Sequence, residues 1–503
     1  MMLDTIIDKI TIVEYNEEDI LKQGIRKKNV FVIVLILATS TYFALVPSLD
    51  FIPSLGAYNT QRVLQIGVLA GTALLIITHS KCLSLWLTTW FTLPVIVRWA
   101  LSAILILGIL SSITTMDTRY ALLEVGVFTL LFVFAMAVAS FYRQFPQLGN
   151  NIIFFTFLLC AFLYLVKFST SYLTYLLVDG AVLWPAGEMV LGFSHVRYFN
   201  HIQTLTIPIL ISAALLLPPQ YIILKWFITA LTAAWWMLVF GADARATVIA
   251  SIFSICCVIL LYRKTVLSWL KLQLLSCATG FSCYMLLFRV DGGQVSGDFI
   301  RYGDSGRLNM WQNAASLITQ DPVLGAGPIH YAHVANNFHF THPHNTYLQF
   351  AAEWGVPAFL ILCAIGLYGC FAWLKQNHEI FKKKPEAKPK LIRIGLTASL
   401  IAGLAHAFVS GLMVAPMSQL IVALITGWIF GVYITEQKSI SVDFQGSHRW
   451  VLRGFLAAVI TFMVLNTYTE VVVLEEKLET YYAEHHIQFL GPRFWRQGKM
   501  GFD

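Results

Sequence analysis

Two histidines, His342 and His344, stand directly before an apolar segment that begins at Thr346. An imidazole can take up or release a proton near neutral pH, and an ionisable group at a membrane boundary usually serves a function. The pair therefore predicts general acid–base chemistry. We favour His344 as the base because it adjoins Asn345 and opens the apolar segment, and His342 remains the second candidate.

Arginines without neighbouring lysines are the second chemical feature. Five of them lie in polar segments that contain no lysine: Arg197, Arg245, Arg289, Arg301 and Arg307. A guanidinium group is planar and permanently charged, so it can donate to phosphate oxygens two at a time. Several such groups at a membrane surface predict a ligand that carries a diphosphate. The alternative is that they pair with nearby aspartates or with lipid headgroups.

A metal site is the competing interpretation of the histidines, because five of them fall within 15 residues: His330, His333, His339, His342 and His344. Their spacing is compatible with ligation. However, no cysteine accompanies them, the His-Glu-x-x-His pattern is missing, and the segment is predicted to be a loop. We therefore expect no metal and no cofactor, and a single catalytic or substrate-orienting histidine explains the cluster better.

The composition places these residues in a membrane protein. Hydrophobic residues make up 57% of the 503 positions and charged residues 12%, whereas a soluble domain carries about 25% charged residues. Apolar runs of roughly 20 residues match membrane helices and exceed the 9–11 residues of a barrel strand. We predict an all-α polytopic membrane protein. The net charge of +7 is attributed to cytoplasmic anchoring lysines, so membrane lipids are expected as partners and nucleic acid is not.

About thirteen membrane helices are predicted. The basic segment 22–28 precedes the first one, so the positive-inside rule starts it from the cytoplasm. Alternation then puts every lysine-bearing connector on the cytoplasmic side, which supports the count. The predicted helices lie at about 29–48, 62–80, 94–113, 119–141, 150–168, 204–220, 222–241, 246–262, 266–288, 346–374, 392–413, 417–435 and 450–470.

This topology divides the chain into five parts. They are a cytoplasmic segment 1–28, nine helices within 29–288 with a periplasmic loop at 169–203, a large periplasmic loop 289–345, four helices within 346–470, and a periplasmic tail 471–503.

The large loop is predicted to be partly helical and to carry the catalytic groups. Residues 289–304 are rich in Gly, Asp and Ser, which is typical of an exposed connector. Ser305 can cap a short amphipathic helix that carries Arg307 and lies on the membrane surface. Asp321, followed by proline, ends that helix.

Five motifs lie between about residues 190 and 360. They are Gly192–Thr204, Ala242-Asp243-Ala244-Arg245-Ala246, Ser305-Gly306-Arg307 with Trp311, Asp321–Gly327, and His344-Asn345-Thr346-Tyr347-Leu348-Gln349 with Glu353-Trp354-Gly355. Together they resemble the signature of the bacterial O-antigen ligase superfamily. This superfamily also holds O-antigen polymerases and protein O-oligosaccharyltransferases.

The resemblance implies a metal-independent glycosyltransferase in the bacterial inner membrane, with its active site facing the periplasm. The donor would be an oligosaccharide on undecaprenyl diphosphate. In a mechanism that fits, Arg245 and Arg307 hold the diphosphate and stabilise its growing charge, and His344 accepts the proton of the attacking hydroxyl. Further substrate-binding candidates are Arg197, Gln203, Arg301, His342, Asn345 and Glu353, although Glu353 fits equally an interfacial carboxylate.

The acceptor distinguishes the members of the superfamily. Ligases use a lipid A core sugar, polymerases another glycan, and O-oligosaccharyltransferases a serine or threonine of a pilin or other exported protein. We favour the protein acceptor because an odd number of helices leaves the tail 471–503 outside, where its aromatic residues and arginines could contact a protein or the interface. If the helix at 450–470 does not insert, ligation takes the lead. A lipid-linked glycan transporter is the alternative of a different class, although no clear inverted repeat supports it.

Overall fold

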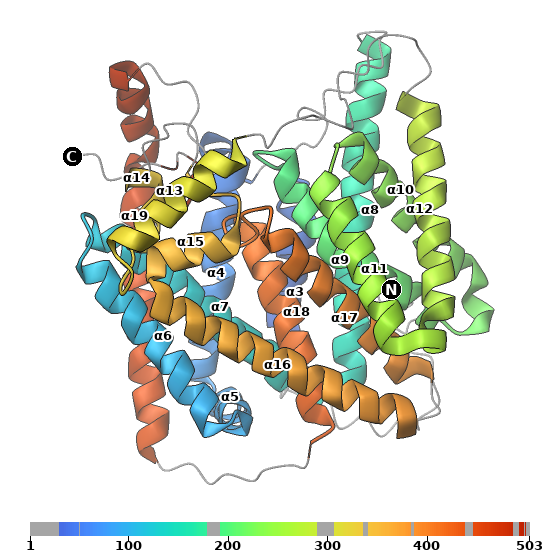
Figure 1. Cartoon of the computed structure of the whole chain (residues 1–503), viewed down its shortest axis with the longest axis horizontal. Helices are drawn as coiled ribbons and strands as arrows, with labels where there is room; N and C mark the ends of the chain where they lie inside the picture. Colours follow the sequence, from blue (N-terminus) through green and yellow to red (C-terminus); the bar gives the residue numbers. More distant parts are fainter. Residues whose placement is uncertain are drawn as a thin grey trace.

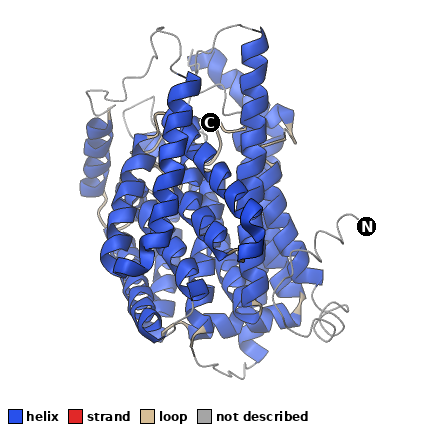
Figure 2. Ribbon diagram, turned by 90° about the vertical axis from the view of Figure 1, so that its right-hand side faces the viewer, coloured by secondary structure: helices blue, strands red, loops and turns tan. Residues whose placement is uncertain are grey.

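The computed structural model is a bundle of helices (Figures 1 and 2). It describes residues 30–49, 51–178, 192–288, 306–334, 341–383, 387–437, 446–485, 492–496 and 498, and these residues contain no strand. In chain order the helices are α3 (Val30–Leu45), η1 (Pro53–Leu55), α4 (Gly56–Thr78), α5 (Ser80–Thr92), α6 (Val95–Ile113), α7 (Thr118–Gln144), α8 (Pro146–Val178), α9 (Val196–Leu216), η2 (Pro219–Tyr221), α10 (Ile222–Gly241), α11 (Arg245–Tyr262), η3 (Arg263–Val266), α12 (Leu267–Phe288), α13 (Arg307–Gln320), α14 (Tyr331–Val334), α15 (Thr346–Trp354), α16 (Val356–Lys383), α17 (Ala387–Ala407), α18 (Pro416–Thr435) and α19 (Gly446–His485).

The prediction of an all-α polytopic membrane protein is confirmed. In the part of the chain that the structure describes, eleven helical stretches are long and apolar enough to cross a membrane. One of them, Arg245–Leu287, holds both α11 and α12, which turn at η3, where Arg263 has a φ of 49° (Figure 1). The sixteen residues of α3 occupy the first predicted position. Each of the thirteen predicted helices therefore has a counterpart.

Two predicted outer segments are more helical than expected. α8 continues to Val178 and α9 begins at Val196, so the loop predicted at 169–203 is shortened from both sides. α19 runs to His485, well past the predicted end at 470. Neither 169–178 nor 471–485 contains glycine or proline, so nothing in these segments ends a helix.

The helix predicted at 346–374 is broken into α15 and α16 at Gly355. This residue has a φ of 84°, a conformation that glycine adopts without strain. A Cβ there would lie 2.1 Å from the carbonyl oxygen of Val323, so only glycine permits this close approach. Pro357 then occupies the first turn of α16, where its missing N–H costs nothing. The break leaves α15 as a separate nine-residue helix.

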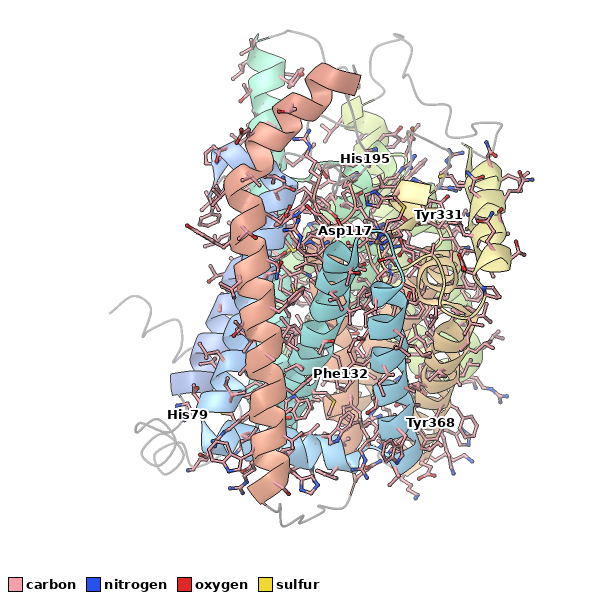
Figure 3. The ribbon with its side chains drawn as sticks, turned by 90° about the vertical axis from the view of Figure 1, so that its left-hand side faces the viewer. His79, Asp117, Phe132, His195, Tyr331 and Tyr368 are labelled. Atoms are coloured by element: carbon pink, nitrogen blue, oxygen red, sulfur yellow. The ribbon has the colours of Figure 1, made fainter. Side chains whose placement is uncertain are left out.

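The helices α13, α14 and α15 lie together at one end of the bundle, which we call the site end (Figure 1). Figure 3 places His195 and Tyr331 toward this end and His79 and Tyr368 toward the other. α9 is almost wholly buried and packs against α10 and α17, while α7 packs against α18. These central helices carry the segments that support α15.

Candidate functional site

The turn that carries His342 and His344 is held in a strained form. His344 has a φ of 50°, which is uncommon for a residue other than glycine. Its backbone N–H donates to Nδ1 of His342 over 3.2 Å, and the two ring centroids are 4.2 Å apart. Such strain persists only where surrounding contacts enforce it and is concentrated at functional sites.

Asn345 caps α15, so the prediction that His344 and Asn345 open this helix is confirmed. The Asn345 side-chain oxygen accepts from the N–H groups of Tyr347 and Leu348, each over 3.0 Å. Asn345 therefore has a structural task through this oxygen, and its contact with substrate stays a prediction.

The turn between α17 and α18 supports the start of α15. The hydroxyl of Thr346 donates to the carbonyl of Ser410 over 3.0 Å and accepts from the N–H of Leu412 over 3.1 Å. Gly411 lies directly beneath His342, because a Cβ at this glycine would come within 2.9 Å of the imidazole. The segment 408–415, which was predicted in part as helix, therefore packs beneath the histidine turn and supports it.

Arg307 is joined to the histidine turn through its own helix. It is the first residue of α13, and Trp311, one turn later, donates from Nε1 to the carbonyl of Pro343 over 3.0 Å. The expected amphipathic helix is thus present, but Gly306 stands at its cap position with a φ of 75° and no side-chain cap bond. Ser305, the predicted cap, lies outside the described residues.

Arg197 reaches the same region from α9. It is exposed near the start of the helix, where its N–H donates to Nδ1 of the capping His195. One turn further, His201 bonds to the hydroxyl of Ser410 over 2.7 Å and to that of Ser418 over 2.9 Å. Since the Ser410 carbonyl accepts from Thr346, α9 and α15 are tied to the same turn.

Arg245 begins the adjacent helix α11 and is half-buried. Asp243, two residues earlier, has a φ of 48°, so a second strained backbone position precedes a candidate residue. Thr247 fixes α11 against α9 by a 2.9 Å bond to Thr204, which also bonds to Nδ1 of His406 over 2.8 Å. Arg245 is therefore carried by an element that this polar network connects to the site end.

The electrostatics link the arginines directly to the proposed base. Burial, followed by the positive charges of Arg197 and Arg307, lowers the pKa of His344 to about 3. Burial and the charges of His344 and Arg493 hold the pKa of His342 well below its usual range. Both imidazoles are therefore neutral at pH 7, which is the form that a proton acceptor needs, and each is a weaker base than a free imidazole until an opposite charge approaches.

Other predicted residues lie elsewhere. Gln203 is fully buried between α9 and α10, where its amide donates to the carbonyl of Trp235 over 3.0 Å. His330 joins two loops, since its Nε2 accepts from the N–H of Asp117 and its Nδ1 donates to Pro328. Arg301 and His339 fall outside the described residues. Within the described ranges, no three His, Cys, Asp or Glu side chains are placed to hold a metal ion.

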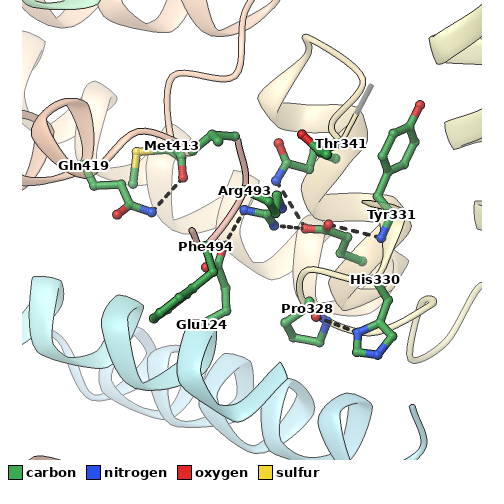
Figure 4. A network of polar contacts seen from close by, with 12 residues as sticks. Glu124, Pro328, His330, Tyr331, Thr341, Met413, Gln419, Arg493 and Phe494 are labelled. Carbon is green, nitrogen blue, oxygen red and sulfur yellow. Dashed lines mark hydrogen bonds and ion pairs between the residues drawn. The ribbon is translucent and has the colours of Figure 1, made fainter. Parts of the chain in front are cut away.

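The partner of the Glu353 carboxylate is Arg493 from the C-terminal tail, which pairs with it inside the protein (Figure 4). The guanidinium of Arg493 bridges Glu353 and Glu124 over 2.5 and 2.9 Å, and all three side chains are almost completely buried. The backbone N–H of Tyr331 and the amide of Gln349 also donate to Glu353. Burial alone would lower the pKa of Arg493, but the two carboxylates outweigh it and raise that pKa.

The tail residues predicted to contact an acceptor or the interface are inside the protein. Arg493, Phe494 and Trp495 are at most 2% exposed. Arg62 of α4 holds this segment, because its Nε donates to the Phe494 carbonyl over 2.9 Å. The two aromatic side chains are shielded from water because they pack against the helix bundle. The predicted contact between the tail and an acceptor is therefore wrong for these three residues.

The cluster of Glu124, Arg493 and Glu353 was not identified from the sequence, although one of its members, Glu124, had a signal there. Glu124 is an acidic residue within the apolar run predicted at 119–141, and an acid inside a membrane helix requires a partner. Nothing local pointed to Arg493, which lies 369 positions away.

A comparison with protein families finds that residues 228–363 match the family described as O-antigen ligase. The matched region contains Arg245, Arg307 and His344, and it confirms the resemblance inferred from the motifs. No curated protein matches the chain. The chain is thus a multi-pass membrane protein that is similar to a family of glycan-transferring enzymes.

Proposed function

We propose, from this family similarity, that the protein transfers an oligosaccharide from undecaprenyl diphosphate to a hydroxyl acceptor at the periplasmic face of the inner membrane. The observation that carries the proposal is the bond from Trp311, one turn after Arg307, to Pro343, directly before His344. This bond connects the helix that carries the guanidinium group of Arg307 to the turn that carries the proton acceptor His344. Transfer from a diphosphate donor needs both groups.

In the proposed reaction, the acceptor oxygen attacks the anomeric carbon of the donor sugar. The bond from that carbon to the diphosphate oxygen breaks, and the diphosphate leaves with the electron pair. Arg307 and Arg245 stabilise the charge that develops on it, with Arg197 as a further contact. The hydroxyl proton passes to His344, whose help is worth about 10²–10⁴-fold.

His344 suits the base role better than His342. It is half-buried, whereas His342 is 5% exposed and uses Nδ1 to accept the His344 N–H. The arginines that lower the pKa of His344 are also proposed to bind the diphosphate. Because opposite charge raises the pKa of a nearby base, donor binding would make His344 more basic when it is needed.

A serine or threonine of a pilin or another exported protein is our first candidate acceptor. It is supported by the thirteen-helix layout, which brings the upper end of α19 to the site end (Figure 1). A lipid A core sugar is the second candidate, favoured by the description of the matched family.

The test is a purified, vesicle-reconstituted protein supplied with undecaprenyl-diphosphate-linked oligosaccharide and either pilin or lipid A core. Mass spectrometry then measures glycan attachment to each acceptor. Transfer to pilin supports the first candidate, and transfer to core alone supports the second. Glycan that crosses the vesicle membrane without attachment to any acceptor would contradict the enzymatic proposal and favour a transporter.

A further inference from the structure

Residues 492–496, which we call the C-terminal strap, contact both ends of the segment that carries the histidines. At the near end, the hydroxyl of Thr341 donates to the carbonyl of Pro492 over 2.8 Å. Thr341 lies three residues before His344 and is 3% exposed. The strap therefore holds the chain as it enters the histidine turn.

At the far end, Arg493 holds Glu353 in the last turn of α15. The backbone of this turn is also fixed, because the Glu353 carbonyl accepts from the N–H of Gly327 over 3.0 Å and from the hydroxyl of Ser111 over 3.2 Å. α15 has nine residues, and at 1.5 Å per residue it is roughly 13 Å long. A constraint on Glu353 is thus transmitted to His344 through a short, rigid element.

The strap is itself fixed to the core by α4. Tyr58 donates from its hydroxyl to the Arg493 carbonyl over 2.6 Å, and Arg62 donates to the Phe494 carbonyl. The N–H of Arg496 donates to the side-chain oxygen of Asn59 over 2.8 Å. Residues in the first two turns of one membrane-spanning helix therefore position a segment from the other end of the sequence.

The chemistry of Arg493 fits only an arginine. Its side chain has no exposure, and two of its nitrogens reach separate carboxylates on α7 and α15. A lysine would keep the charge but is a single point donor on a flexible stem. The bridge between Glu124 and Glu353 depends on the guanidinium fork.

We propose that Arg493 is a positioning residue for His344. The strap clamps the segment 341–354 at both ends and so sets the place of the imidazole relative to the donor. This inference rests on the proposed glycan transfer, but it adds a requirement for the C-terminal strap that lies outside the matched region 228–363. Arg493 itself does not touch the reacting atoms.

The first test is Arg493→Lys in the full chain. Because misplacement of a reacting group by 1 Å can cost about 10²-fold, we expect kcat for glycan transfer to fall about ten- to hundredfold. The KM for the donor should stay within about twofold, since the arginines proposed to bind it are untouched. Arg496→Ala is the matched control, because only its backbone is bonded to Asn59, and it should leave kcat and KM unchanged. An Arg493→Lys protein that is folded and keeps its full kcat would overturn the proposal.

Thr341→Val is the second variant, in case Arg493→Lys does not fold. It removes one hydroxyl donor that contributes about 0.5–1.5 kcal/mol to stability, so the unfolding midpoint should fall slightly. The kcat should fall by about threefold, because the segment before His344 is held less firmly. Unchanged kcat in this variant would also contradict the clamp.

A measurement that needs no activity separates this proposal from the proposed function. Hydrogen exchange should become faster across 341–354 in Arg493→Lys, and it should stay unchanged in α17. If the wild type transfers no glycan, the proposed function fails, while faster exchange still supports the clamp. Unchanged exchange in 341–354 overturns the clamp whatever the activity.

Discussion

Buried arginines stand at both ends of the bundle, and two of them, Arg393 and Arg493, are satisfied in different ways. Away from the site, Arg393 near the start of α17 donates to the side-chain oxygen of Asn377 on α16 over 2.5 Å. It also lies over the ring of Trp373 at 4.7 Å and close to the carbonyl of Val432 on α18. These three partners are neutral and sit on neighbouring helices, and the charge of Glu436 at the end of α18 also acts on Arg393. Arg393 therefore joins three helices at the end opposite the histidines.

At the site end, Arg493 is held by two carboxylates, and it comes from the C-terminal strap and not from a helix of the bundle. Strain is also concentrated here. Of the four non-glycine residues with positive φ in the described part of the chain, Asp243, Ile329 and His344 lie at this end and only Arg263 at the other. Each such position costs on the order of 1–3 kcal/mol. The comparison indicates that the contacts of Arg393 stabilise the end opposite the histidines. At the site end, strained backbone positions lower the stability and place the functional groups.

His344→Ala is the sharpest way to test this difference. We expect glycan transfer to fall by at least about 10²-fold, because a positioned base contributes about 10²–10⁴-fold. The unfolding midpoint should change little, because the side chain is only half-buried and alanine keeps the same strained backbone conformation. The measurement is kcat in reconstituted vesicles beside thermal unfolding in detergent. Transfer at the wild-type rate would refute the base assignment, and His342→Ala would then be the variant to examine.

Arg307→Lys should have the next largest effect. A lysine keeps the charge but loses the forked donor, and a hydrogen bond to a charged group is worth about 1.5–3 kcal/mol. That energy corresponds to a loss of kcat/KM of about ten- to hundredfold. Leu308→Gln, at the exposed neighbouring position, is the control and should retain activity. Full activity of Arg307→Lys would mean that the residue supplies only charge.

Local patterns in the sequence located the histidine turn but not what supports it. Asn345 before an apolar run predicted a helix start, and the structure shows the cap. The break at Gly355 also had a local signal, a glycine followed two residues later by a proline, although the expected helix ran through it. Such features depend on a few adjacent residues, so a single sequence contains them.

The Glu124–Arg493–Glu353 cluster could not be predicted in the same way. Its partners are separated by 369 and 140 positions, so no spacing or periodicity connects them. Glu124 indicated that a cation must pair with it within the membrane, but several of the predicted outer arginines could have been that partner. Only the folded arrangement of α7, α15 and the strap selects Arg493.

Arg393→Met tests the stabilising end. Loss of the guanidinium leaves the buried Asn377 oxygen without this donor, which costs about 1–3 kcal/mol. We expect a lower unfolding midpoint and an unchanged kcat per folded molecule. Lys383→Gln is the control, because its 3.8 Å pair with Glu379 is exposed and contributes little. A fall in kcat of folded Arg393→Met would show that the two ends are coupled and would break the comparison.

The smallest expected effect is a shift in the pH profile of Arg197→Gln. The pKa of His344 is lowered to about 3 by burial first and by Arg197 next. In the wild type, kcat/KM should therefore stay level as the pH falls from 8 to well below 6.5, because the imidazole remains neutral. Removal of the Arg197 charge raises this pKa, so the acid limb should move to higher pH. The same lowered pKa makes stability depend on pH. As the pH drops from 6.5 toward 3, the unfolded chain takes up a proton at this histidine before the folded chain does, so the free energy of unfolding falls. This fall should be smaller in Arg197→Gln. The control is Arg143→Gln, in the last turn of α7 at the opposite end of the bundle, which should leave the pH profile unchanged. An acid limb near pH 6.5 in the wild type would mean that the arginines do not act on the base.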